Sequence, residues 1–154
     1  MSTVSSRLSE LGICLPAAMA PVANYVPVNI TGALVTVSGQ LPAIGGKVEV
    51  TGKLGGGLSL EDGQRAARLC FINILAQLQA ALPGGLESVT KVVRLGGFIA
   101  CAPDFTQHAV VMNGASDLAV AVFGEAGRHA RSTVGVASLP LDAAVEVEGL
   151  FHIG

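Results

Sequence analysis

The sequence predicts an α+β fold in which a mixed sheet carries two main helices on one face. Segments rich in branched residues, typical of strands, lie before, between and after two segments with helical spacing, in the order β-β-(β)-α-β-α-β-β. The chain has 154 residues, of which 51% are hydrophobic, and this is enough for one domain with a substantial core. We therefore expect a single domain over residues 1–154.

Residues 1–24 are expected to add a short helix and a linker to this domain. Leu8 and Leu11 have helical spacing, and the following "LPAAMAP" contains two prolines that disfavour regular structure. Two strands are expected next, in "YVPVNITG" and "ALVTVSGQLP", joined at Gly32. Pro27 cannot donate to a strand ladder, so we expect it at a sheet edge or a bulge.

The clearest element is a helix expected within "SLEDGQRAARLCFINILAQLQAAL". Ser59 is a residue type preferred at helix N-caps, and Glu61 and Asp62 favour the positive end of the helix dipole. Cys70 falls in the apolar stretch of this helix and is expected in the core. The Pro-Gly-Gly run that follows is expected to end the helix.

The C-terminal half is expected to hold a long strand, a second helix and two further strands. The segment "VTKVVRLGGFIAC" is typical of a strand, with a kink expected at Gly96-Gly97. The second helix is expected within "FTQHAVVMNGASDLAVAVFGEAG" and is clearest from Gly114 to Phe123, with Asn113 near its start. The last two strands are expected at Ser132 to Ser138 and Ala144 to His152, joined as a hairpin.

These last two strands carry charges in a chain that is otherwise poor in charge. Residues two apart on a strand share a face, so Glu146 and Glu148 point together while Val145 and Val147 point the other way. The valines fit the core beneath the helices, which places both acids on the opposite face, where a buried carboxylate needs a partner or a proton. Arg131 is the candidate partner, because a guanidinium binds carboxylates and keeps its charge when desolvated.

The hairpin geometry places that partner in another subunit. With the turn near position 141, Arg131 would lie opposite about position 151, and at ~3.3 Å per residue this is roughly 16 Å from Glu146 along the strand. Contact between the two is therefore expected only across a subunit boundary. An interface salt bridge without any chemistry is the alternative to a ligand site.

The composition indicates that further copies of the chain cover much of its surface. Charged residues make up 13%, against roughly 25% in average soluble domains, and missing polar surface is typical of subunit interfaces. A monomer with a small apolar patch is the alternative. The apolar runs are too short for a transmembrane helix of roughly 20 residues. The nine Lys and Arg residues are scattered, which argues against nucleic-acid binding.

The cysteines and histidines show neither a disulfide framework nor a metal site. Cys14, Cys70 and Cys101 are odd in number and lack CxxC spacing, which fits a reducing cytoplasm. The three histidines are widely separated and lack metal-ligand spacing. Cys101 ends a predicted strand, and no base is evident beside it in the sequence. We expect a cytoplasmic protein that binds no metal.

The segment "ARSTVGVASLPLDAAVEVEG" resembles the C-terminal signature of the reactive-intermediate deaminase family, the RidA or YjgF-like proteins also labelled endoribonuclease L-PSP. The segment "VSGQLP" and the glycine-rich stretch after it resemble a second motif of this family. The resemblance implies a chorismate-mutase-like fold and a homotrimer packed around a central barrel, with clefts between subunits. It also implies hydrolysis of enamine or imine acids such as 2-aminoacrylate to 2-keto acids and ammonia, with no cofactor.

The resemblance further implies roles for individual residues. Arg131 would bind the substrate carboxylate, and Glu146 would position or activate a water molecule. The cleft would be lined by Tyr25, Ser38, Gly39, Asn113 and Thr133.

Two departures from the family pattern indicate a divergent subgroup. His129 stands where proline is commonest, and Thr133 stands where cysteine is commonest. The leading interpretation is a deaminase of small imino acids. One alternative is a trimeric binding or regulatory protein that holds a carboxylate ligand without turnover. Another is an endoribonuclease or translation inhibitor, against which the lack of a basic patch counts.

Overall fold

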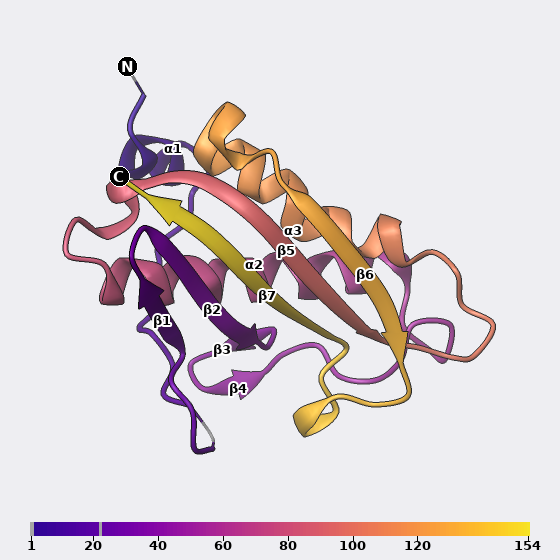
Figure 1. Cartoon of the computed structure of the whole chain (residues 1–154). Helices are drawn as coiled ribbons and strands as arrows, with labels where there is room; N and C mark the ends of the chain where they lie inside the picture. The colour runs from indigo at the N-terminus through magenta and orange to yellow at the C-terminus, as the bar shows by residue number, and fades with distance from the viewer. Residues whose placement is uncertain (1, 22) are drawn as a thin grey trace.

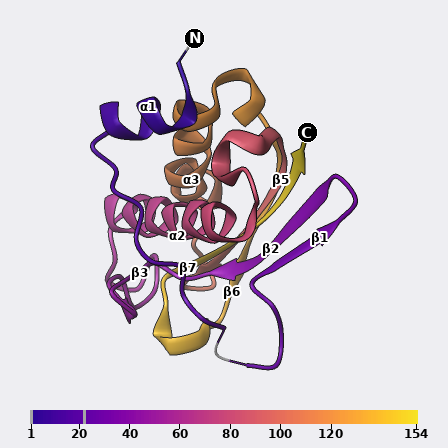
Figure 2. The same cartoon turned by 90° about the vertical axis from the view of Figure 1, so that its left-hand side faces the viewer.

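The computed structural model describes residues 2–21 and 23–154 of the chain. Its helices lie on one face of a mixed β-sheet and leave the other face without a helical cover (Figures 1 and 2). This confirms the predicted α+β class. The helices and strands are, in chain order, α1 (Val4–Glu10), β1 (Val28–Thr31), β2 (Leu34–Gln40), β3 (Ala43–Ile44), β4 (Lys47–Val48), α2 (Leu60–Ala81), β5 (Val89–Ala100), α3 (His108–Phe123), β6 (Ala130–Val136) and β7 (Val145–Ile153).

The main sheet has the strand order β1-β2-β7-β5-β6, and β3 and β4 form a separate two-stranded sheet. Neighbouring strands of the main sheet are antiparallel except β5 and β6, which are parallel. A parallel pair needs a crossover connection, and α3 supplies it between the end of β5 and the start of β6. β1 and β6 are therefore the edge strands, and Pro27 directly precedes the edge strand β1, as predicted.

The predicted hairpin between the last two strands is wrong. β5 lies between β6 and β7, and Arg131 pairs with Leu95 of β5 rather than lying opposite position 151. Burial explains the order, because β7 has buried residues at alternate positions along most of its length, whereas no β6 residue is fully buried. The strand with the continuous apolar face gains more from the central position under the helices.

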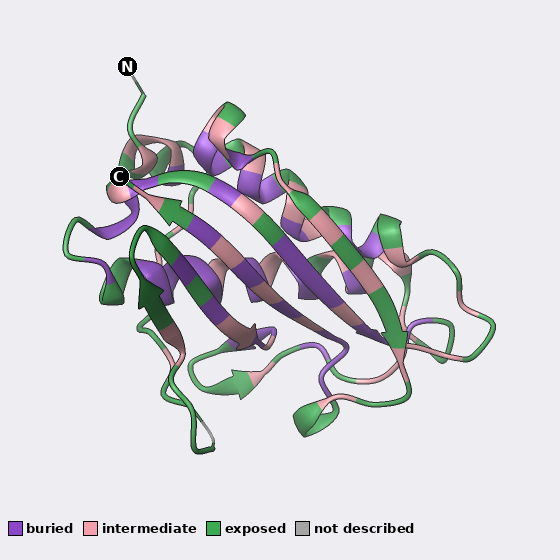
Figure 3. Ribbon diagram, viewed as in Figure 1, coloured by how far each residue is buried: buried purple, intermediate pink, exposed green. Residues whose placement is uncertain are grey.

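The core lies between the sheet and the helices. Along β7, buried residues alternate with partly buried ones (Figure 3). Val145, Val147 and Phe151 are buried toward the helices, while Glu146 and Glu148 are only partly buried on the other face. The expectation that both acids face away from the helices is confirmed. The side of the core formed by α2 consists of residues fully shielded from solvent, and it includes the predicted cysteine: Cys70, Phe71, Ile74, Leu75 and Leu78.

The predicted start of α2 is confirmed. The Ser59 hydroxyl accepts a hydrogen bond from the Asp62 backbone N–H at 3.1 Å, and the Asp62 carboxylate accepts one from the Ser59 backbone N–H at 2.9 Å. This reciprocal pair satisfies two backbone donors that the first helical turn would otherwise leave without a partner.

Helix α3 begins at His108, within the segment 105–127 that the sequence predicts as helical, and Asn113 lies in its second turn. Val111 and Met112 are fully buried, and this burial stabilises the helical residues before Gly114. The segment His108–Gly127 is long and apolar enough for a membrane span by composition alone, but its buried face packs against α2 and the sheet.

The glycine pair of β5 does not mark the irregularity of that strand. The register shifts of β5 against β7 lie earlier, before Leu95. Gly96 and Gly97 instead leave room on the two faces of the sheet. A Cβ atom at Gly96 would lie 2.8 Å from Glu148 Oε1, and one at Gly97 would lie 2.6 Å from Met112 Sδ.

We predict that Gly114→Ala destabilises the fold. A Cβ atom at Gly114 of α3 would overlap the backbone carbonyl of Gln64 in α2, and a helix backbone cannot move as easily as a side-chain end. The expected loss is about 1–3 kcal/mol in the free energy of unfolding, measured by urea denaturation. Gly63→Ala is the control, since its Cβ would meet the side-chain ends of Leu54 and Val111. Equal effects of the two substitutions would contradict the prediction.

Candidate functional site

The residues expected to line a ligand cleft fall into two separate groups in one chain. The first, here called the β6 cluster, comprises the expected residues Asn113 and Arg131 together with two further residues, Ser116 and His129, on α3 and β6. The second, the β2–β7 cluster, comprises Tyr25, Ser38, Gly39 and Glu146.

Helix α3 holds the guanidinium of Arg131 in place. Its Nη1 donates to Asn113 Oδ1 at 2.8 Å and to Ser116 Oγ at 3.0 Å, and its Nη2 donates to the Ala109 carbonyl oxygen at 3.2 Å. The three acceptors lie along successive turns of one helix face. Because a β6 residue can reach this face only from the helix-covered side of the sheet, Arg131 points toward the helices.

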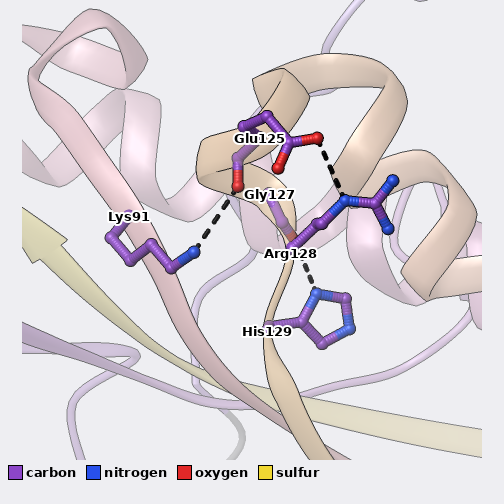
Figure 4. A network of polar contacts seen from close by, with 5 residues as sticks. All are labelled: Lys91, Glu125, Gly127, Arg128 and His129. Atoms are coloured by element: carbon purple, nitrogen blue, oxygen red, sulfur yellow. Dashed lines mark hydrogen bonds and ion pairs between the residues drawn. The ribbon is translucent and has the colours of Figure 1, made fainter.

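His129 extends this arrangement toward the turn that precedes β6. Its Nδ1 lies 2.6 Å from the Gly127 carbonyl oxygen, a contact drawn in Figure 4, and its Nε2 lies 2.9 Å from Ser116 Oγ. A carbonyl can only accept, so Nδ1 carries the proton and Nε2 accepts from the Ser116 hydroxyl. The Ser116 oxygen in turn accepts from Arg131, so these groups form one hydrogen-bonded chain.

Burial favours the neutral form of this histidine. The pKa of His129 is lowered, chiefly by desolvation and also by the positive charges of Arg131 and Lys91, although the Gly127 carbonyl opposes the shift. A neutral imidazole is the form that the hydrogen-bonded chain requires, because a protonated ring would leave Ser116 without its acceptor.

Arg131 is a cation with neutral partners. Among residues 2–21 and 23–154, the one ion pair within 4.0 Å joins Arg128 and Glu125, and the partners of Arg131 are an amide, a hydroxyl and a carbonyl. Three of its five N–H groups take part in these bonds. Beside it lies an open hollow of about 260 Å³, lined also by Ser116, Asp117, Val120, Arg128 and His129. The free donors of Arg131 suit a small anionic ligand, while Asp117 adds one negative charge to the wall of the same hollow.

Thr133 shares the strand with Arg131, two residues further along β6. Its Oγ1 is buried and has no hydrogen-bond partner within the part of the chain that the structure describes. Thr133 pairs with Gly97 of β5, the glycine that leaves room for Met112. The threonine hydroxyl is therefore an unused polar group next to the β6 cluster.

The β2–β7 cluster lies where β2 ends. Ser38 Oγ donates to the Val26 carbonyl oxygen at 2.8 Å, and the Ser38 backbone N–H donates to the Pro27 carbonyl oxygen at 2.9 Å. These bonds fix the segment that carries Tyr25, whose side chain lines a shallow hollow of about 50 Å³ together with Gly39. Tyr25 itself is exposed.

Glu146 lies directly against Gly39. A Cβ atom at position 39 would overlap the Glu146 carboxylate, so a glycine there leaves room for this side chain. Burial raises the pKa of Glu146, and the negative charge of Glu148 on the same face raises it further. The side chain is thus more easily protonated than an exposed glutamate.

One chain does not bring the two clusters together. Arg131 on β6 is aligned with Leu95 on β5, and Leu95 is aligned with Gly149 on β7. Gly149 lies three residues from Glu146, so Arg131 and Glu146 are two strands apart and offset by three residues. At ~4.8 Å between strands and ~3.3 Å per residue, the two Cα atoms are roughly 14 Å apart. Their side chains also point to opposite faces of the sheet.

Sequence reasoning missed several polar partners. Ser116 and His129 belong to the β6 cluster, and the spacing of Asn113 and Ser116 at i, i+3 on a helix was the available signal. The expectation that Cys101 has no base beside it is wrong, because His108 Nε2 lies 3.7 Å from its Sγ. Seven residues and a change of element separate this pair, so no local pattern indicates it.

The fold belongs to a known class of small α+β proteins. Residues 5–152 match the family described as "YjgF/chorismate_mutase-like, putative endoribonuclease", and the chain is a member of this family. The Trypanosoma cruzi protein TCP17 is 50% identical over 97% of this chain and 94% of its own length. The crystal structure of a protein of unknown function from Agrobacterium tumefaciens is 50% identical, with a TM-score of 0.91 over 98% of this chain and 92% of that one.

More distant structures carry the names of the predicted family. RidA from an Antarctic Psychrobacter is 29% identical, with a TM-score of 0.62 over 88% of this chain and 94% of that one. TdcF from E. coli, solved with bound serine, is 26% identical, with a TM-score of 0.60 over 90% of this chain and 93% of that one. The resemblance to the RidA and YjgF proteins is confirmed.

We predict that His129 makes stability depend on pH below neutrality. An unfolded chain protonates this histidine near pH 6.5, whereas the folded chain resists protonation to lower pH. Stability is therefore lost as the pH falls through 6.5 toward the folded-state pKa. The stability difference between the wild type and His129→Gln, measured by urea denaturation, should shrink over this range. His152→Gln, at an exposed histidine, is the control; an unchanged difference for His129→Gln would refute the assignment.

Proposed function

We propose that the chain is a deaminase subunit that hydrolyses small 2-imino or enamine acids, such as 2-aminoacrylate, to 2-keto acids and ammonia. The reaction would take place in clefts between the copies of a homotrimer. The observation that carries the proposal is the division of charge in the chain. Arg131 has a fixed position and no carboxylate partner in the described residues, and Glu146 is a half-buried acid on the opposite face.

Arg131 would bind the substrate carboxylate. Its contacts with Asn113, Ser116 and Ala109 hold the guanidinium before a ligand arrives, so little conformational entropy would be lost on binding. A carboxylate can take up the remaining donors in a charge-assisted pair. The serine bound to the relative TdcF is itself a small molecule with a carboxylate next to an amino-bearing carbon, which supports this choice of ligand.

Glu146 would act first as the general base and then as the general acid. Water attacks the carbon of the protonated imine, Glu146 accepts a proton from that water, and the resulting neutral carbinolamine carries hydroxyl and amino groups on one carbon. Glu146 then returns the proton to the nitrogen. The C–N bond breaks as the carbonyl forms, and the hydroxyl proton leaves with the nitrogen as ammonium. A carboxyl with a raised pKa suits both steps, because its proton affinity is closer to neutral pH than that of an exposed glutamate.

A second copy of the chain would complete the site. The helices leave one face of the sheet uncovered (Figure 2). That face carries Glu146 and Glu148, and the edge strand β6 carries Arg131. Packing the open face of one copy near the β6 edge of another would place the two clusters on opposite walls of one cleft. The low content of charged residues, 13%, supports burial of this face in an oligomer.

We predict that the protein accelerates keto-acid release from imines made in the assay by a threonine or serine dehydratase. Arg131→Ala should lower the rate at least about 100-fold through loss of substrate orientation, and Glu146→Gln should lower it by about 10²–10⁴-fold. Arg128→Ala is the matched control, because Arg128 lines the same hollow but pairs with Glu125 on the surface. Keto-acid formation is followed by absorbance.

Other outcomes separate the alternative functions. A folded protein that binds imino-acid analogues through Arg131 but never accelerates hydrolysis would be a binding or regulatory protein. RNA cleavage that persists on purification and falls in Arg131→Ala would support the endoribonuclease label of the family. Either result would overturn the deaminase proposal.

We also predict that mixed assemblies regain activity. In trimers formed at random from equal amounts of the Arg131→Ala and Glu146→Gln chains, about a quarter of the clefts would combine an intact Arg131 with an intact Glu146. Co-expressed chains should therefore recover about a quarter of the wild-type rate. Mixing Arg131→Ala with the Arg131→Ala/Glu146→Gln double variant is the control and should recover nothing. No recovery in trimers confirmed by mass to be mixed would show that one chain supplies both residues.

A further inference from the structure

A cysteine and a histidine that the proposed deaminase site does not use lie together at the far end of β6. Cys101 follows the last residue of β5, and its backbone N–H donates to the Val136 carbonyl oxygen at 3.2 Å. His108 is the first residue of α3. The distance from Cys101 Sγ to His108 Nε2 is 3.7 Å, within hydrogen-bonding range for sulfur.

The surrounding residues fix this pair. The ring of Phe105 packs edge-on against the His108 imidazole, with 5.3 Å between ring centroids. Gly135 of β6 leaves the space that the two side chains occupy, because a Cβ atom there would lie 2.6 Å from His108 Nε2 and 2.7 Å from Cys101 Sγ. Any larger residue at position 135 would have to displace the pair.

The pair opens into a hollow with mainly apolar walls. The hollow has a volume of about 370 Å³, and beside Cys101 and His108 it is lined by Ala102, Pro103, Phe105, Gly135, Val136 and Ala137. Cys101 is partly exposed there, whereas Cys70 is fully buried in the core. A small molecule with little charge can therefore reach the sulfur.

We propose that Cys101 and His108 form a nucleophilic pair that adds covalently to small α,β-unsaturated carbonyl compounds. His108 Nε2 takes the thiol proton, and the thiolate, which is the reactive form of cysteine, attacks the β-carbon. A carbon–sulfur bond forms as the electron pair of the C=C bond moves to the α-carbon, and the imidazolium returns the proton to that carbon. The net reaction adds S–H across the double bond, so neither an oxidant nor a leaving group is needed.

This site is separate from the β6 cluster. Gly135 lies four residues beyond Arg131 on β6, which corresponds to roughly 13 Å along the strand. The ligand class also differs, because the walls around Cys101 offer no cation for a carboxylate. The proposal therefore stands or falls independently of imine hydrolysis.

Acrylamide, a small α,β-unsaturated amide, tests the proposal on the full-length native protein. Peptide mass spectrometry at successive times gives the alkylation rate of each cysteine. Cys14 is exposed and Cys101 only partly so, so accessibility alone predicts that Cys14 reacts first. The nucleophilic pair predicts that Cys101 reacts at least about 10-fold faster than Cys14.

Two variants test the role of the partner. His108→Gln should slow alkylation of Cys101 about 10-fold and leave Cys14 unchanged, since only Cys101 loses its base. Gly135→Ala should have the same effect by separating Sγ from Nε2. Labelling of the buried Cys70 would show that a variant is unfolded. In that case, the Cys101 rate of the variant that remains folded tests the role of His108. Faster alkylation of Cys14 than Cys101 in the wild type, or an unchanged Cys101 rate in both folded variants, would overturn the proposal.

Discussion

The parallel pairing of β5 with β6 determines where the functional side chains lie. Because parallel strands require a crossover, α3 must cross the sheet before β6 begins, and this places α3 beside the strand that carries Arg131. β6 becomes an edge strand and β7 is inserted between β5 and β2. The arginine is thereby held from the helix side, while the acids of β7 remain on the uncovered face.

Local patterns in the sequence predicted much of this architecture. Alternation along β7 placed Glu146 and Glu148 on one face, and the chemistry of Ser59 and Asp62 placed the start of α2. Both features depend on residues within one element. The strand order does not, because it is set by competition between strands for the centre of the sheet. The buried alternation of β7 was visible in the sequence, but its consequence for the neighbouring β6 was not.

The candidate site could also be predicted only in part. The resemblance to the RidA and YjgF proteins indicated Arg131 and Asn113 as site residues. In the structure, Arg131 Nη1 donates to Asn113 Oδ1 at 2.8 Å. The resemblance did not indicate that Ser116 and His129 would join them, because His129 stands where the family commonly has proline. Similarly, the nearness of Cys101 and His108 depends on the path of the loop between β5 and α3 and on a glycine in a third element, Gly135.

Arg131 and Glu146 lie on opposite faces of the sheet within one chain. Arg131 is held by neutral groups, and burial makes Glu146 easier to protonate. Burying the two charges together inside one subunit would cost desolvation free energy, which their mutual attraction need not repay. Keeping them on opposite faces leaves each partly solvated within the chain. In the proposed assembly, a ligand with a carboxylate and a hydrolysable imine would contact Arg131 of one copy and Glu146 of another. The free energy of binding the carboxylate to Arg131 could then orient the imine beside Glu146.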